Sequence, residues 1–278
     1  FAVGRTQEIL YFMGRMKQER LVKSAPDFPV YVDSPLAGKA TTIFAGDLRG
    51  YLDEEALELV RTHQSMFTFP GLRLTESLEE SKMLNTDKTP KVILSASGMC
   101  DAGRIRHHLK YNLWRHDSTV VFVGFQGEGT LGRTLLEGAK SVKLFGEEIA
   151  VNAEIVNFKG LSSHADRNHL LAWAQAFDGP KHIFVTHGDR EVAPYFAESL
   201  QKLGLEAHAP QYTECWDLLS GRMVEQGYLP ERKTSAYAGG KVSTAYQRLV
   251  AMGKLLQEVI ARSKGRANRD LGNFADQI

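Results

Sequence analysis

Four short apolar runs, each followed by small or polar residues and then by a stretch with helical spacing, limit the fold of this chain most strongly. They are PVYV, KVIL, TVVFV and HIFV. The third run shows no alternation of apolar and polar residues, which is typical of a strand that is buried on both faces. Because such strands alternate with helices along the chain, we predict an α/β fold with a mainly parallel sheet.

Capping residues and turns refine this expectation. Thr6 is a candidate cap for the first helix, and Ser34 followed by Pro35 suits the start of a second helix. Between residues 141 and 160, consecutive strands predict antiparallel pairing. After residue 228 a polar, glycine-rich linker leads to a basic amphipathic helix. We expect its apolar face to pack against the rest of the chain, and a contact of the helix with RNA or a partner chain is the alternative.

The composition argues against several classes of protein. The 278 residues are 43% apolar and 24% charged, and a net charge of +1 means that any anion site must be local. Two cysteines argue against a disulfide framework or a thiolate zinc cluster and suit a reducing cytoplasm, where we expect the protein to reside. No stretch approaches about 18 uncharged apolar residues, so we expect no membrane span. Because the first residue is Phe1 rather than methionine, we expect either a removed N-terminus or the later part of a longer chain.

Two glycine-containing stretches resemble nucleotide-binding loops. Gly127, Gly129 and Gly132 have the G-x-G-x-x-G spacing of dinucleotide sites, but the helix that follows is short and a hairpin-like pair succeeds it. We therefore favour a tight connection between two domains. The stretch PLAGKAT lacks the first glycine of a phosphate-binding loop, and Ala40 stands where a hydroxyl would hold magnesium, so we reject it.

The stretch LSASGMCDAGR, residues 94–104, is a stronger candidate for an anion site. Its small residues let backbone N–H groups approach an anion, and a helix is expected to begin near Asp101 to Gly103. Arg104 and Arg106 could supply charge-assisted bonds to a phosphate. The alternative is a close-packed turn with a solvated basic face, and the residues alone do not decide between the two.

Two histidines, His164 and His187, stand 23 positions apart in similar surroundings. His164 precedes a predicted helix, and His187 ends an apolar strand, the place where ligands gather in α/β sheets. An acid follows each, and Asp189 is a candidate cap for the next helix. A histidine at such a position can donate a proton to an oxygen that develops charge. The other seven histidines lack this context, and we predict that His107 and His108 are solvated.

These stretches together resemble a known family. GLSSHAD and VTHGD are similar to motifs B and C of the β-CASP branch of metallo-β-lactamase-fold nucleases, which has RNA-processing and DNA-processing members. FAVGRTQEIL, VDSPLA, SASGMCDAGRIRHHL and GFQGEGTLGRTLLEG are similar to the rest of the β-CASP region, in the same order. The resemblance runs from Phe1 to about Tyr228 and includes the RNA-metabolising metallo-β-lactamase motif.

The resemblance implies the domain organisation. It predicts a β-CASP domain, a parallel sheet flanked by helices, over residues 1–127. Residues 128–228 would form the C-terminal part of a metallo-β-lactamase αββα domain. Residues 229–278 would be a linker and the basic helix.

It also implies roles for individual residues. His187 matches the motif C histidine, a ligand to one of two zinc ions, and His164 matches the motif B histidine, which assists at the scissile phosphate. Ser162 would help to hold that phosphate. The turn of Ser97, Gly98 and Met99 would lie along the path of the nucleic acid. Arg104 stays a predicted phosphate contact on its residue chemistry. Because the DNA-processing branch has valine at motif C, His187 favours RNA.

Most metal ligands that the family uses are absent from the sequence. They are H-x-H-x-D-H, a further histidine and a bridging aspartate, all ahead of the β-CASP insertion, and this sequence contains no H-x-H. A catalytic zinc takes about three protein ligands, so His187 alone cannot hold one. We therefore interpret the chain as the C-terminal portion of a two-zinc ribonuclease that is inactive by itself and does not retain the zinc.

The expected partners are RNA and the missing N-terminal half of the lactamase-like domain, and a homo-oligomer is left open. The leading alternative is a non-catalytic nuclease-like protein that holds RNA without cutting it. An upstream H-x-H-x-D-H would separate these two hypotheses. A nucleotide-cofactor enzyme that uses Gly127–Gly132 is the third hypothesis, and a failure to bind any dinucleotide would exclude it.

Overall fold

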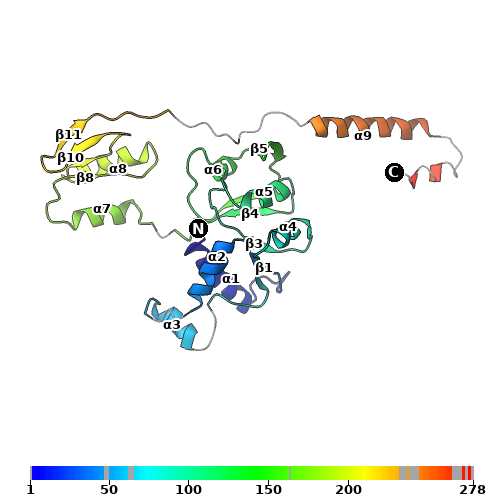
Figure 1. Ribbon diagram of the computed structural model, residues 1–278, viewed down its shortest axis with the longest axis horizontal. Coiled ribbons are helices and arrows are strands. Elements are labelled where there is room, and N and C mark those ends of the chain that lie inside the picture. Colours follow the sequence, from blue (N-terminus) through cyan, green and yellow to red (C-terminus); the bar gives the residue numbers. More distant parts are fainter. Residues whose placement is uncertain are drawn as a thin grey trace.

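The structure is a computed structural model that describes most of the chain in three spatial groups (Figure 1). A central body contains the elements up to β7, a second lobe contains α7 to β11, and α9 lies apart from both. The described residues are 2–46, 50–61, 66–162, 164–231, 237, 244–264, 271–272 and 275–276. Within these ranges, no helix combines the length and the apolar character that crossing a membrane requires.

The first part of the body is a parallel sheet. Strand β1 (Val30–Val32) lies between β2 (Leu72–Leu74) and β3 (Val92–Leu94), and Val30 stands opposite both Leu72 and Val92. Helices α1 (Arg5–Gln18), α2 (Pro35–Phe44), α3 (Glu54–Arg61) and α4 (Leu78–Thr86) connect or flank these strands. The apolar side chains of α1, α2 and β1 share one core, which includes Leu10, Val32 and Ala37. The prediction of a parallel α/β arrangement is confirmed here.

The helix starts confirm one capping prediction and correct another. Ser34 caps α2, since its hydroxyl accepts the N–H of Ala37 at 3.3 Å, and Pro35 is the first helical residue. Thr6 does not cap α1. The N-cap is Gly4, whose N–H donates to the Gln7 side chain at 2.7 Å, and Thr6 is buried in the first turn.

The second part of the body joins a parallel strand pair to a hairpin. Strand β4 (Thr119–Phe122) pairs in parallel with β7 (Glu154–Asn157), while β5 (Ser141–Leu144) and β6 (Glu147–Ala150) are antiparallel. The antiparallel prediction is therefore confirmed for the hairpin and wrong for β7. The expectation that β4 is buried on both faces is also wrong, because Val121 is 53% exposed.

A single apolar core runs through this second part. It is formed by β4 to β7, α5 (Ile105–Asn112) and α6 (Leu131–Leu136), and it includes Cys100, Leu113, Phe122, Leu131 and Leu144. Its members come from both sides of residue 127. Burial of such side chains contributes roughly 25 cal/mol per Å² of apolar surface, so these segments stabilise one another.

The second lobe repeats the strand–helix rhythm that the sequence predicts. Helix α7 (Arg167–Gln175) is followed by β8 (Ile183–Phe184), α8 (Val192–Gln201) and β9 (Ala207–His208), and β8 pairs in parallel with β9. The hairpin of β10 (Cys215–Asp217) and β11 (Arg222–Glu225) follows.

The C-terminal helix α9 (Thr244–Arg262) does not pack against the rest of the described chain, contrary to the prediction. Figure 1 shows it beyond the end of the body. Its apolar side chains recur at helical spacing, but they face solvent, as Leu249 does at 69% exposure. The amphipathic pattern of α9 was correctly predicted. The prediction that the rest of the chain covers its apolar face is wrong for the described residues.

Candidate active site

His164 lies in the exposed segment that enters α7. Asp166 is the N-cap of that helix, and its carboxylate accepts the N–H of His169 at 2.9 Å. The backbone N–H of His164 donates to the Ser162 hydroxyl at 3.3 Å. The structure thus places two predicted site residues, His164 and Ser162, in one small turn just ahead of a capped helix.

His187 lies just beyond β8 and is also exposed. Its backbone has a φ of 62°, a left-handed conformation that costs a residue other than glycine about 1–2 kcal/mol. Strain of this kind is often retained at functional sites. The carboxylate of Asp189 does not cap α8 as predicted. The backbone carbonyl of Asp189 accepts the N–H groups of Val192 and Ala193 instead, at 3.0 and 3.2 Å.

Both histidines therefore belong to the second lobe, on the loops that lead into α7 and α8. These two helices pack against each other, and the Arg167 guanidinium reaches the Ser199 hydroxyl at 3.4 Å. No contact joins the His164 and His187 side chains in the described part of the chain, so their convergence on one phosphate stays a prediction.

The described residues do not fit a zinc ion by themselves. Across these parts of the chain, no three histidine, cysteine, aspartate or glutamate side chains are grouped so that they could hold a metal. A catalytic zinc site needs about three protein ligands. His187 can be at most one of them.

The turn from β3 to α5 holds three more predicted site residues. Gly98 and Met99 are exposed, and Ser97 has a left-handed φ of 70°. The Ser97 hydroxyl accepts the N–H of Ala102 at 3.3 Å. Helix α5 begins at Ile105, slightly later than predicted, because the preceding residues form this tight turn.

Hydrogen bonds join this turn to the glycine-rich stretch after β4. The Gln126 side chain donates to the Gly98 carbonyl at 2.9 Å, and the Gly132 N–H donates to the Met99 carbonyl at 3.0 Å. A Cβ atom at Gly132 would stand 1.8 Å from the Gln126 side-chain oxygen, so only glycine fits without a shift. These contacts favour the structural connection over the dinucleotide site.

Arg104 is held by internal acceptors. Its guanidinium donates to the Asp33 carboxylate at 2.6 Å, and to the carbonyls of Thr75 at 3.3 Å and Glu76 at 2.8 Å. A direct contact between Arg104 and RNA remains a prediction, and it would have to compete with these bonds.

His108 is buried, so the prediction that it is solvated is wrong. Its Nε2 atom lies 2.6 Å from the Asp33 carboxylate, and its Nδ1 atom lies 2.9 Å from the Asn85 side-chain oxygen. Arg104, the N-cap of α5, and His108 stand four residues apart, so their side chains lie on the same side of the helix, and that side meets the end of β1. The four-residue spacing of Arg104 and His108 is the sequence feature that could have predicted that the two side chains share a contact. His107, by contrast, is exposed as predicted.

Asp33 is the centre of this network. Burial opposes ionisation of its carboxyl, but hydrogen bonds from His108, Ser81 and Arg104 outweigh that effect and lower the Asp33 pKa from 3.8 to about 2. The residue follows β1 at the carboxyl edge of the parallel sheet, and it ties together β1, α4 and α5.

Comparison with known proteins identifies the family. The profile of the Beta-Casp domain matches residues 6–135, and that of the Zn-dependent metallo-hydrolase RNA specificity domain matches residues 148–210. The chain is 35% identical to ribonuclease TTHA0252 of Thermus thermophilus over 214 residues, which is 77% of this chain and 48% of that protein. It belongs to the β-CASP family.

Two further relatives are similar over a comparable part of the chain. The RNase J-like protein of Methanocaldococcus jannaschii is 30% identical over 202 residues, 73% of this chain and 45% of that protein. Transcription termination factor FttA of Methanosarcina mazei is 30% identical over 217 residues, 75% of this chain and 33% of that protein. The chain therefore spans about half or less of the length of these relatives. The fold inferred from the resemblance, β-CASP joined to the C-terminal part of a metallo-β-lactamase fold, is confirmed.

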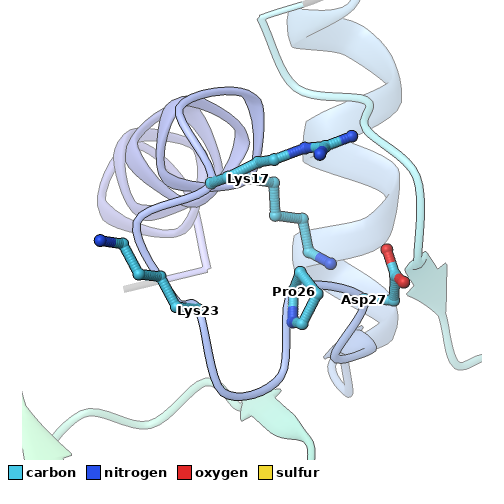
Figure 2. Close-up of a pocket in the computed structure, with 5 residues that line it drawn as sticks. Lys17, Lys23, Pro26 and Asp27 are labelled. Carbon is cyan, nitrogen blue, oxygen red and sulfur yellow. The ribbon is translucent and has the colours of Figure 1, made fainter.

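One hollow in the Beta-Casp region was not predicted. It has a volume of about 380 Å³ and lies between the end of α1 and the segment that leads into β1 (Figure 2). The Lys17 ammonium is bonded to the Phe28 carbonyl at 2.6 Å, and Figure 2 shows Lys23 pointing away from Asp27. The hollow is at the opposite end of β1 from Asp33, and its cations do not converge, so we assign it no site.

Proposed function

We propose that this chain is the C-terminal portion of a β-CASP ribonuclease and hydrolyses RNA only when an upstream half supplies the missing metal ligands. The match to the RNA specificity domain over residues 148–210 carries this proposal, because that range includes both His164 and His187. We also propose the division into residues 1–127, 128–228 and 229–278.

His164 is proposed as the proton donor at the scissile phosphate, with Ser162 as a contact to that phosphate. The exposure of both residues and their shared turn support these roles, since a catalytic acid must reach its substrate. His187 is proposed as one zinc ligand, and its strained, exposed position after β8 supports that role. Zinc would draw its other ligands from outside this chain.

Exposed apolar side chains on β4 and α7 support the proposal that an N-terminal half of the lactamase-like domain packs against this chain. Within the described residues, β4 has β7 as its partner strand and leaves Val121 uncovered. On α7, Trp173 is 62% exposed beside the exposed ring of Phe177. Such surfaces commonly mark an interface. We propose that the N-terminal half of the lactamase-like domain covers them and brings the two histidines together.

An RNA cleavage assay tests the proposal. This chain would be assayed alone and joined to an upstream half that carries H-x-H-x-D-H, with end-labelled RNA as substrate. We expect the joined protein to cleave the RNA, and we expect no cleavage by this chain without the upstream half. RNA binding without cleavage by the joined protein would favour the alternative, a non-catalytic RNA-binding protein, and would refute the hydrolase.

A further inference from the structure

Phe145 stands in a backbone position that aromatic residues rarely occupy. It and Gly146 form the two-residue turn between β5 and β6, with φ values of 50° and 81°. Turns with two left-handed residues strongly prefer asparagine, aspartate or glycine, because a large side chain is strained there. The Phe145 ring is nevertheless 44% exposed. The hairpin therefore presents an aromatic ring to solvent at a cost in backbone strain.

The first turn of α5 supplies two further groups to this ring. The His107 imidazole stacks on Phe145 with a centroid distance of 4.5 Å and an angle of 23° between the planes. The Arg106 guanidinium carbon lies 4.7 Å from the same ring centroid. The three side chains form a mixed cationic and aromatic stack, which we call the hairpin stack.

The charge of Arg106 is not neutralised by a neighbour. In the described ranges, Arg106 makes no ion pair, and its Nε atom is buried without a hydrogen-bond partner. The neighbouring cation Lys110 is different, because it pairs with Glu147 of β6. An arginine that is held against an aromatic ring and has no carboxylate partner among the described residues is suited to bind an anion.

We propose that Arg106, His107 and Phe145 bind an unpaired nucleotide of single-stranded RNA, with its base on the hairpin stack and its phosphate at Arg106. This inference rests on the proposed function, which makes RNA the substrate. Unpaired bases stack on aromatic rings and on guanidinium planes, whereas paired bases are not available for stacking. A phosphate adds a charge-assisted contact to arginine. The hairpin stack would thus select unpaired RNA.

Binding of labelled single-stranded oligoadenylate to this chain, followed by fluorescence anisotropy, tests the inference. Phe145→Asn places a residue that the turn prefers at this position, so it removes the ring without harming the fold. We expect it to weaken binding about tenfold, the usual scale for one lost base stack. Arg106→Gln should weaken binding and reduce its salt dependence, while Lys143→Gln, on the same hairpin, is the matched charge control and should have little effect.

Three outcomes would overturn the inference: binding by Phe145→Asn within about twofold of the unsubstituted chain, equal binding of duplex DNA, or no binding of oligoadenylate. The proposed function fails separately, if the joined protein cleaves no RNA. Loss of oligoadenylate binding in Phe145→Asn would support the hairpin stack even in that case.

Discussion

The Asp33 carboxylate and the His108 imidazole, 75 residues apart in the sequence, lie 2.6 Å apart at the end of β1. The Arg104 guanidinium, at the N-cap of α5, reaches the same carboxylate at 2.6 Å. Asp33 is fully buried, and its network fixes the helix that follows the Ser97–Met99 turn. The position of a predicted RNA contact thus depends on a buried ionic cluster behind it.

Asp33→Asn should destabilise the body strongly. The change keeps the size of the side chain but leaves Arg104 without its charge partner, and breaking a buried pair costs about 3–5 kcal/mol. Urea unfolding followed by circular dichroism measures this loss. Asp117→Asn, which removes the exposed pair with Arg115, is the control and should change stability little. Equal effects of the two substitutions would contradict the account.

Acid should destabilise the protein through Asp33. Its pKa is lowered from 3.8 to about 2 in the folded state, so the stabilisation is present above pH 4 and is lost as the pH falls toward 2. The shift corresponds to about 2 kcal/mol. The free energy of unfolding should therefore fall more steeply between about pH 4 and pH 2 in the unsubstituted protein than in Asp33→Asn. Parallel pH profiles would exclude this role.

Gly132→Ala should disturb the contact between the Ser97–Met99 turn and the glycine-rich stretch that follows β4. The added methyl group would displace the Gln126 side chain and weaken its bond to the Gly98 carbonyl. Overpacking of this kind costs about 1–3 kcal/mol, which a shift in the thermal unfolding midpoint would show. Gly253→Ala is the control, because open space surrounds that residue and alanine favours a helix. A midpoint as high for Gly132→Ala as for this control would argue against the close contact.

Sequence patterns anticipated the local structure better than the long-range contacts. The apolar runs and the Ser34–Pro35 pair located strands and a helix start because their signals are local. The burial of His108 depends on Asp33, and the pairing of β7 depends on β4. Both partners are distant in the sequence, so no short stretch of residues predicts either feature. The stack on Phe145 was missed because it joins a hairpin tip to a distant helix.

His164→Ala in the joined protein should lower the RNA cleavage rate by roughly 10²–10⁴, the scale for a lost proton-transfer group. Zinc content should not change, since His164 is not a proposed ligand. His169→Ala is a matched control, because His169 is also exposed near the start of α7 but bonds to Asp166. Unchanged cleavage in His164→Ala would remove that residue from the mechanism.

The zinc content of the joined protein, measured by elemental analysis with and without His187→Ala, tests most directly whether this chain completes a metal site. About two zinc ions per joined protein, a clear loss in His187→Ala and no stable zinc in this chain alone are the predicted results. Full zinc occupancy in His187→Ala would contradict the account.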